Sequence, residues 1–441
     1  MTFKTHTIWI SLSLFFLIAQ NNDLELDVNS QNRSLHGAFG AVTIDGKIWN
    51  QLALRPTLPF GNLSVAFDVV LYIDQNGNIY DEGWDFSSGE KIKNTLIDKI
   101  YYVRYKNSWD RNYFRIGALD NISLGYGILI NNYCNTLLYP QVRKVGIDFK
   151  SHVFGVNVHG FTNDFKENFG LTGLRFSAPV PYGFNVGVSW VGDRNQYLGL
   201  RDRDSDGRPD LVDDFPLDKL YWLDTDGDGL ADNMDNEWDI DGDGITDTLD
   251  SRIDGWKLDT VIVLDDSIFT KAEPININEE FESFHAFALD AGIPILNDGQ
   301  IKINFYAQLA ALLGKTINPE TEEQEAAGYG LIPLGLGAKL GLARFNFEFR
   351  MVPEGNFEFG YFDRSYEIER ATFELGPDNR GNIITKSKKL GLYGPQNGFY
   401  SSLLLNLGSL FDAKMAFQSL TGEMYNCLLY TSDAADEGLG V

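Results

Sequence analysis

Apolar and polar residues alternate with a period of two along much of this 441-residue chain, and this alternation restricts the folds that it can adopt. Successive side chains of a β-strand point to opposite faces, so the alternation predicts strands with one apolar and one polar face. The clearest runs cover residues 63–72, 184–190, 301–309 and 344–351. We therefore expect an all-β protein built from antiparallel strands.

The connections between the predicted strands alternate between short and long. Short turns are predicted near residues 55–62, 106–111, 150–152, 178–183, 296–300, 341–344 and 406–411, and long loops near residues 74–98, 119–143, 162–170, 192–280, 314–329 and 353–395. Outer-membrane barrels have short periplasmic turns, long extracellular loops and strands of roughly 9–11 residues that are apolar outside and polar inside. The pattern predicts an antiparallel transmembrane β-barrel of the porin-like, outer-membrane type, with about fourteen strands in this chain.

A soluble β-sandwich is the main alternative, because its strands also alternate. A sandwich buries its apolar face and needs no regular alternation of loop lengths. Its solvent-facing side would seldom place Arg344, Glu348 and Arg350 opposite a uniform aromatic row. We favour the membrane barrel over a soluble protein with two β lobes.

The polar strand positions would line the interior of such a barrel. They are Asp68, Arg104, Arg115, Arg175, Lys302, Arg344, Glu348, Arg350 and Lys414. Mixed charge suits a water-filled pore that selects small hydrophilic solutes, but it would equally solvate the interior of a closed barrel. The loop at 119–143 is unusually apolar. It either folds inward and narrows the pore or, as we favour, packs against the barrel wall.

Three copies of one acidic pattern lie in the longest predicted loop. Residues 202–213, 224–235 and 239–250 each have the spacing D-x-D-x-D-G-x-x-D-x-x-D. Ca²⁺ takes about 6–8 oxygen ligands, which converge only if the chain wraps tightly around the ion. The glycine of each copy tolerates the positive φ that this turn needs. A disordered acidic linker would not keep Asp at five fixed positions in three copies.

The repeats resemble thrombospondin type 3 repeats, which wrap around a string of calcium ions with little regular secondary structure. The resemblance covers about residues 202–254. A helix–loop–helix calcium site would instead close with Glu between amphipathic helices. By this resemblance the Asp residues are calcium ligands: Asp202, Asp204, Asp206, Asp210, Asp213, Asp224, Asp226, Asp228, Asp232, Asp235, Asp239, Asp241, Asp243, Asp247 and Asp250. The backbone carbonyls that follow the glycines would point inward, from Arg208, Leu230 and Ile245.

The net charge of −26 is concentrated in the repeats, since residues 202–254 hold 19 acidic and 4 basic side chains. Metal sites explain this acidity, and the absence of a basic stripe in the sequence argues against nucleic-acid binding. The expected partners are outer-membrane lipid, calcium ions, and either small hydrophilic solutes or an extracellular surface partner.

Residues 1–19 have the features of a secretory signal peptide, with Lys4 before an apolar stretch that is short for a bilayer span. Residues 427–441 resemble the translation of a sequencing adapter, so the natural chain is expected to continue differently after residue 426. Without that segment Cys134 is the remaining cysteine, and no internal disulfide is expected.

The expected organisation is a signal peptide (1–19), a first part of the barrel (20–195), an extracellular calcium loop (196–275) and a second part of the barrel (276–426), followed by the adapter-like segment (427–441). This arrangement predicts a bacterial outer-membrane location, with secretion as the alternative.

Catalytic signatures are weak. The five His residues form no i,i+4 pair and no zinc spacing, and the sequence has neither a G-x-S-x-G elbow nor a glycine-rich phosphate loop. We therefore predict a protein that is not an enzyme. One reading is a porin-like channel with a calcium-ordered loop. The alternatives are a calcium-dependent adhesion or scaffold protein anchored by the barrel, and a secreted, soluble adhesin with two β lobes.

Overall fold

The computed structural model describes residues 34–44, 47–75, 77, 99–139, 142–165, 167–224, 229, 231, 273–375, 381–406, 412–422 and 426–433. The chain divides into two compact units. The first comprises Met1–Asp193, Phe284–Ile368 and Ser387–Val441, and the second comprises Arg194–Ser283 and Glu369–Lys386. The predicted signal peptide lies outside the described residues.

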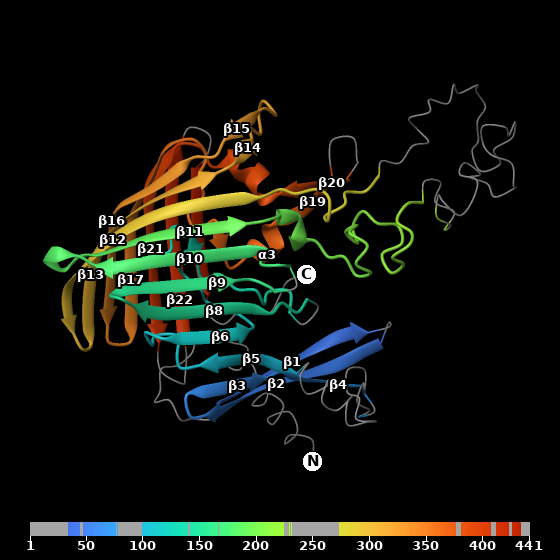
Figure 1. The fold of residues 1–441 in the computed structure, drawn as a ribbon, viewed down its shortest axis with the longest axis horizontal. Coiled ribbons are helices and arrows are strands. Elements are labelled where there is room, and N and C mark those ends of the chain that lie inside the picture. The colour runs from blue at the N-terminus through green and yellow to red at the C-terminus, as the bar shows by residue number, and fades with distance from the viewer. Residues whose placement is uncertain are drawn as a thin grey trace, which may run out of the picture. The chain divides into compact units, whose positions relative to one another are not determined.

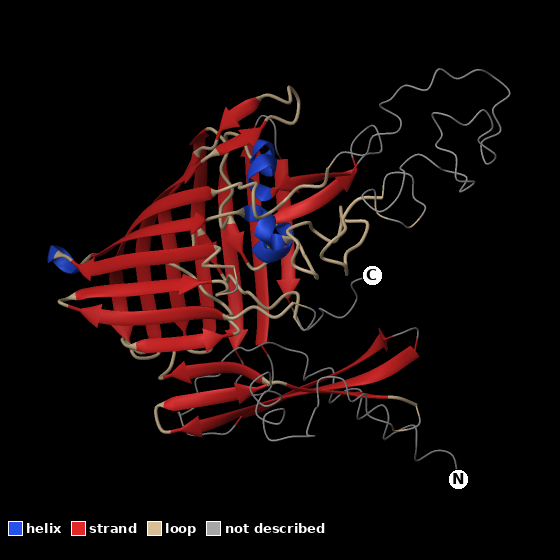
Figure 2. Cartoon of the chain, turned by 45° about the vertical axis from the view of Figure 1, so that its right-hand side comes forward, coloured by secondary structure: helices blue, strands red, loops and turns tan. Residues whose placement is uncertain are grey.

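The first unit is built on one large antiparallel sheet (Figures 1 and 2). This sheet has 17 strands among the described residues. Its strands are β1 (Ser34–Ile44), β2 (Lys47–Phe60), β3 (Leu63–Phe67), β4 (Val69–Ile73), β5 (Ile100–Tyr105), β6 (Tyr113–Gly117), β8 (Gly146–Val153), β9 (Val156–Thr162), β10 (Leu171–Pro179), β11 (Asn185–Asp193), β12 (Phe284–Asp298), β13 (Ile301–Leu313), β16 (Tyr329–Leu340), β17 (Ala343–Glu354), β21 (Gln396–Asn406), β22 (Asp412–Gly422) and β23 (Asn426–Asp433).

Each strand of this sheet pairs with the next one along the chain, except around β3 and β4. Both of these pair with β2, and β5 pairs with β3 rather than with β4. Among the described residues, β1 and β23 each have a neighbouring strand on one side only, and so does β4. The predicted all-β, antiparallel class is confirmed. The strands from β2 to β22 are separated by the predicted turns and loops, except that the run predicted as one strand at 63–72 is divided at Asp68 into β3 and β4.

Two further details of the sheet differ from the sequence prediction. Strand β1 was not predicted, and β2 runs on to Phe60, which leaves a shorter turn than expected. Pro56 and Pro59 lie within the predicted turn at 55–62. The fixed φ of proline also suits extended backbone, and β2 continues through both residues.

The two faces of the sheet differ in polarity, as β12 and β13 show. Phe287 and Leu289 are 47% and 55% exposed, whereas Asp290 and Gln308 on the opposite face are 6% and 4% exposed. We call the face with Asp290 and Gln308 the inner face, and the other the outer face. The apolar side chains are thus exposed and the polar side chains are buried, which is the reverse of what is expected for a sheet in a water-soluble protein.

Short elements in the connections complete the described secondary structure. They are the parallel pair β7 (Ile130–Asn131) and β18 (Phe362–Asp363), the hairpins β14 (Lys315–Ile317) with β15 (Gln324–Ala326) and β19 (Ala371–Leu375) with β20 (Gly381–Thr385), and the helices η1 (Pro181–Gly183), η2 (Gln196–Gly199), α3 (Tyr366–Glu369) and η4 (Lys386–Leu392). Among the helices that the structure describes, none is both long enough and apolar enough to cross a bilayer.

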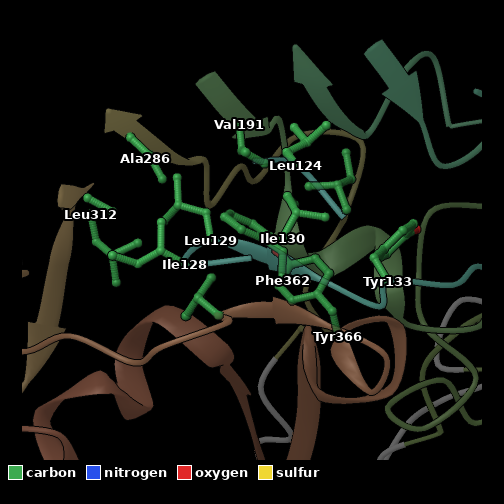
Figure 3. Close-up of a cluster of buried hydrophobic side chains, with 14 of the residues drawn as sticks. Leu124, Ile128, Leu129, Ile130, Tyr133, Val191, Ala286, Leu312, Phe362 and Tyr366 are labelled. Carbon is green, nitrogen blue, oxygen red and sulfur yellow. The ribbon is translucent and has the colours of Figure 1, made fainter. Parts of the chain in front are cut away.

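Two long connections supply much of the apolar core of the first unit (Figure 3). Leu129 and Ile130, from the connection between β6 and β8, pack with Phe362, from the connection between β17 and β21. The same cluster includes Val191 of β11 and Leu312 of β13. The core therefore lies against the inner face of the sheet and joins the two connections there.

The second unit is formed by the chain between β11 and β12 together with the β19–β20 hairpin. Its small apolar core contains Tyr197, Ile277 and Ala371. The fully buried Arg370 donates a hydrogen bond from Nη2 to the backbone oxygen of Asn195, at 3.2 Å. The predicted calcium loop thus shares a core with a hairpin from a distant connection.

Candidate functional sites: an acidic loop and a polar inner face

The first acidic repeat brings three carboxylates together. Asp202, Asp204 and Asp206 each offer an oxygen within 4.8 Å of the others. The chain turns around them through positive φ angles of 64° at Ser205 and 99° at Gly207. The amide groups of both residues donate to the Asp202 carboxylate, at 2.7 and 3.0 Å. The predicted glycine turn is present.

Gly207 is fixed by a second segment of the same unit. Its backbone oxygen accepts a hydrogen bond from the amide of Ile277 at 2.8 Å. A Cβ atom at this position would lie 2.4 Å from side-chain atoms of both Asn276 and Asn278. Glycine is therefore required by its positive φ and by the close approach of the 276–278 segment.

Several carboxylate oxygens of this repeat are buried without a hydrogen-bond donor. They belong to Asp204, Asp206 and Asp213, one Oδ2 atom each. Burial and the neighbouring Asp206 and Asp204 raise the pKa of the Asp213 carboxyl to about 6, although the amide of Phe215 opposes this shift. Unpaired buried acceptors are costly. A bound cation would satisfy these oxygens, and hard oxygen ligands suit Ca²⁺.

The predicted ligands of the first copy are not all gathered. Among the described carboxylates, the close group contains Asp202, Asp204 and Asp206 but not Asp210 or Asp213. Asp210 instead pairs with the guanidinium of Arg203 at 2.8 Å, and Arg201 lies 3.6 Å from it. Two adjacent cations therefore compensate this carboxylate.

Arg208 connects the first repeat to other parts of its unit. Its guanidinium lies 4.4 Å from the ring centroid of Trp222 and 3.5 Å from a carboxylate oxygen of Glu273. The indole of Trp222 donates to the same carboxylate at 3.0 Å. The sequence prediction considered only the backbone carbonyl of Arg208, and this side-chain bridge was missed.

The second copy repeats one feature of the first. The amide of Gly229 donates to Oδ2 of Asp224 at 3.1 Å, and Gly229 has a φ of 91°. This is the same contact, between the sixth and first positions, that Gly207 makes with Asp202. The predicted ligands Asp226, Asp228, Leu230, Asp232 and Asp235, and the whole third copy (Asp239, Asp241, Asp243, Ile245, Asp247 and Asp250), lie outside the described residues.

The inner face of the first unit carries paired charges near the middle of the strands. Arg175 of β10 binds both carboxylate oxygens of Asp290 of β12, at 2.6 and 3.1 Å, across Gly187 of β11. A Cβ atom at Gly187 would lie 2.4 Å from the Arg175 guanidinium. The missing side chain therefore opens the path for this ion pair.

A second pair joins β13 and β17 in a similar way. The hydroxyl of Tyr306 donates to Glu348 at 2.8 Å, and Arg350 lies 2.6 Å from the same carboxylate. The ring of Tyr306 crosses Gly335 of β16, where a Cβ atom would come within 2.2 Å of it. The predicted inward positions Arg175, Glu348 and Arg350 are thus confirmed on the inner face, each with a partner.

The connection between β6 and β8 packs against these groups. Tyr126 stacks on Tyr306, with 4.2 Å between ring centroids and 2° between ring planes. The amide of Ile128 donates to the side chain of Gln308 at 3.3 Å. The 119–143 loop packs against the sheet, as we favoured. The surface that it covers is the inner face, so the loop also folds inward, as the alternative prediction required.

A buried polar cluster that the sequence did not predict holds three connections together. The ammonium group of Lys144 lies between the carboxylates of Glu167 and Glu367. Asn163 donates to Glu167 at 2.8 Å and to Glu367 at 3.2 Å, and Tyr133 also donates to Glu367. No local motif marks these residues, because they are brought together by the fold.

Comparison with known proteins gives no family. No family model matches the chain, and no curated protein sequence matches it. Similar solved structures include a mutant of Rh. blastica porin (8% identity, TM-score 0.30, covering 91% of this chain and 98% of that chain) and the outer membrane channel DcaP of Acinetobacter baumannii (8%, 0.33, 90% and 94%). The outer membrane protein opdK of Pseudomonas aeruginosa is similar at 7% identity (0.30, 88% and 80%).

Proposed function

We propose that this protein is an outer-membrane β-barrel that forms a porin-like channel and carries a calcium-ordered extracellular loop. One observation supports the membrane assignment above all: the outer face of the sheet is apolar and exposed, while the inner face is polar and buried. Exposed side chains of the outer face are Phe176, Val186, Val188, Phe287, Leu289, Phe305, Leu309, Leu334, Phe399, Met415 and Phe417.

Water-soluble proteins rarely expose an apolar surface of this extent. In a bilayer, the same side chains would contact lipid, and the ion pairs of the inner face would be shielded from it. Short turns on one side of the sheet and long connections on the other are also typical of outer-membrane barrels. The soluble, two-lobed alternative would leave the outer face in water.

A charge placed on the outer face tests the membrane assignment. Leu289→Arg, near the middle of β12, should destabilise the protein in lipid by about 2–4 kcal/mol, because the guanidinium would enter the hydrocarbon region. The measurement is the urea midpoint of unfolding in liposomes. Leu220→Arg is the matched control, since Leu220 is 68% exposed in the second unit. Equal, small effects of both substitutions would contradict a lipid-facing sheet.

A measurement of ion conductance tests whether the protein is a channel. The full-length protein, reconstituted in a planar bilayer, should conduct ions through the polar interior. One observation supports a competing function, in which the barrel only anchors a surface adhesin: two connections form an apolar cluster against the inner face. An anchor with a filled interior would give no stepwise currents.

The calcium part of the proposal rests on the first repeat. Three carboxylates converge there, and three buried carboxylate oxygens lack donors. Asp202, Asp204 and Asp206 would hold the ion, and Asp213, whose carboxyl is acted on by the charges of Asp206 and Asp204, is a further candidate ligand. Calcium would cancel the repulsion within a segment whose net charge is strongly negative, so that folding of this segment and binding of metal would be coupled.

A further inference from the structure

Three cations lie side by side across neighbouring strands of the first unit. Lys302 of β13 is directly opposite Lys339 of β16, which is directly opposite Arg344 of β17. We call these residues the basic row. Beyond them, Arg344 faces Leu404 of β21, and Leu404 faces Lys414 of β22.

The basic row belongs to the inner face. Lys302 and Tyr306 are four residues apart on β13, and Arg344 and Glu348 are four residues apart on β17, so the members of each pair point to the same face of the sheet. The hydrogen bond between Tyr306 and Glu348 lies on the inner face. The row lies at the ends of the strands next to the short turns, since β13 begins at Ile301 and β16 ends at Leu340. If the sheet surrounds a channel, the row therefore lies at its short-turn mouth.

The basic row has no ion-pair partner within the described part of the chain. Among the residues that the structure describes, no carboxylate forms an ion pair with Lys302, Lys339 or Arg344. Lys302 and Arg344 are exposed, and Lys339 is half-buried. Deeper in the sheet, Arg350 is paired with Glu348. The cation deeper in the sheet is therefore neutralised by a carboxylate, whereas the cations of the basic row have no such partner among the described residues.

Like charges directly opposite each other destabilise an antiparallel pair. Two such contacts in succession, Lys302 with Lys339 and Lys339 with Arg344, oppose the pairing of these strands. The next level of the face offers uncharged amides from Asn304 and Asn346, both opposite Gly337. Cations followed by amide donors match the requirements of an anion that has lost part of its water shell.

We propose that the basic row makes this protein an anion-preferring channel, with small anions such as chloride and inorganic phosphate as its solutes. The inference rests on the proposed channel function and adds the sign of the charge on the preferred solute. Three uncompensated charges within a Debye length of about 8–10 Å raise the local concentration of anions and lower that of cations.

The test is the reversal potential of the full-length protein in a planar bilayer, first under a gradient of potassium chloride and then of potassium phosphate, with 1 mM calcium on both sides. The wild type should pass anions in preference to potassium. The triple variant Lys302→Gln, Lys339→Gln, Arg344→Gln should lower the ratio of anion to potassium permeability by about threefold or more. The corresponding triple Glu variant should prefer potassium.

Three exposed lysines of other parts of the chain serve as the matched control. Lys47→Gln, Lys219→Gln and Lys315→Gln, combined, remove the same charge and should leave the permeability ratio unchanged. The triple Gln variant should also unfold at the same or a higher urea concentration than the wild type, because it relieves repulsion. A structural role of the row would give the opposite result.

The outcomes separate this inference from the proposed channel. A wild type that conducts but prefers potassium, or a triple Gln variant with an unchanged ratio, would overturn the anion preference alone. A wild type that never conducts would overturn the channel proposal and the preference with it. An unchanged ratio together with loss of binding to isolated peptidoglycan would assign the row to docking of a polyanion instead.

Discussion

Removal of calcium is expected to abolish the order of the acidic repeats while the sheet of the first unit stays folded. At a free calcium concentration ten times the dissociation constant, each bound ion stabilises a folded segment by about 1.4 kcal/mol, or about 4 kcal/mol for three sites. The effect is confined to the repeats because the ligands lie there. Hydrogen exchange of residues 196–224 in the detergent-solubilised protein, with and without a chelator, measures it.

A substitution pair makes this experiment specific for the first repeat. Asp204→Asn with Asp206→Asn should eliminate calcium protection of that segment, because both side chains belong to the close carboxylate group. Without calcium the variant should be at least as protected as the wild type, since it removes repulsion between half-buried acids. Glu279→Gln with Glu280→Gln is the control, as both side chains are exposed in the same unit. Equal exchange with calcium, magnesium or chelator would refute the calcium assignment.

Arg350→Ala is expected to give the largest loss of stability of any single substitution on the inner face. It would leave the carboxylate of Glu348, which is 4% exposed, without its cation. Removing one partner of a buried pair costs about 3–5 kcal/mol. The guanidinium also lies 3.9 Å from the ring centroid of Tyr400, and this contact would be lost as well. Urea unfolding in detergent, followed by the mobility of folded and unfolded forms in a gel, measures the loss.

A double variant separates the cost of the unpaired charge from the value of the contact. Glu348→Gln with Arg350→Met keeps an acceptor for the hydroxyl of Tyr306 and removes both charges, so it should cost less than Arg350→Ala alone. If Arg350→Ala costs under about 1 kcal/mol, the value typical of solvent-exposed pairs, Glu348 is accessible to water. The interior would then be open at this level.

The strands could be predicted because their signal is local. The period-two alternation of residues such as Phe345 and Phe347 is a property of successive residues, and turn-forming glycines mark many of the boundaries. Strand β1 was missed because its short sequence has no clean alternation, and its pairing with β2 is what makes it a strand. The candidate calcium loop was equally visible, since its ligands lie within twelve residues of one another.

The inner face could be predicted only as a set of polar positions. Which of them are paired depends on register, because Arg175 and Asp290 meet across an intervening glycine, far apart in the sequence. The basic row is a similar case. Lys302 and Arg344 were predicted singly as inward positions and Lys339 was not predicted, but the three cations become neighbours only when three strands are aligned.

The sequence by itself therefore determined the antiparallel β class, the order of short and long connections and the acidic repeats, because each depends on residues close together in the chain. The tertiary structure decided what lies against the inner face. In it, Tyr126 stacks on Tyr306, Ile130 pairs with Phe362, and Glu367 forms an ion pair with Lys144. These contacts join connections that are far apart along the chain, and only the alignment of the strands between them determines which side chains meet.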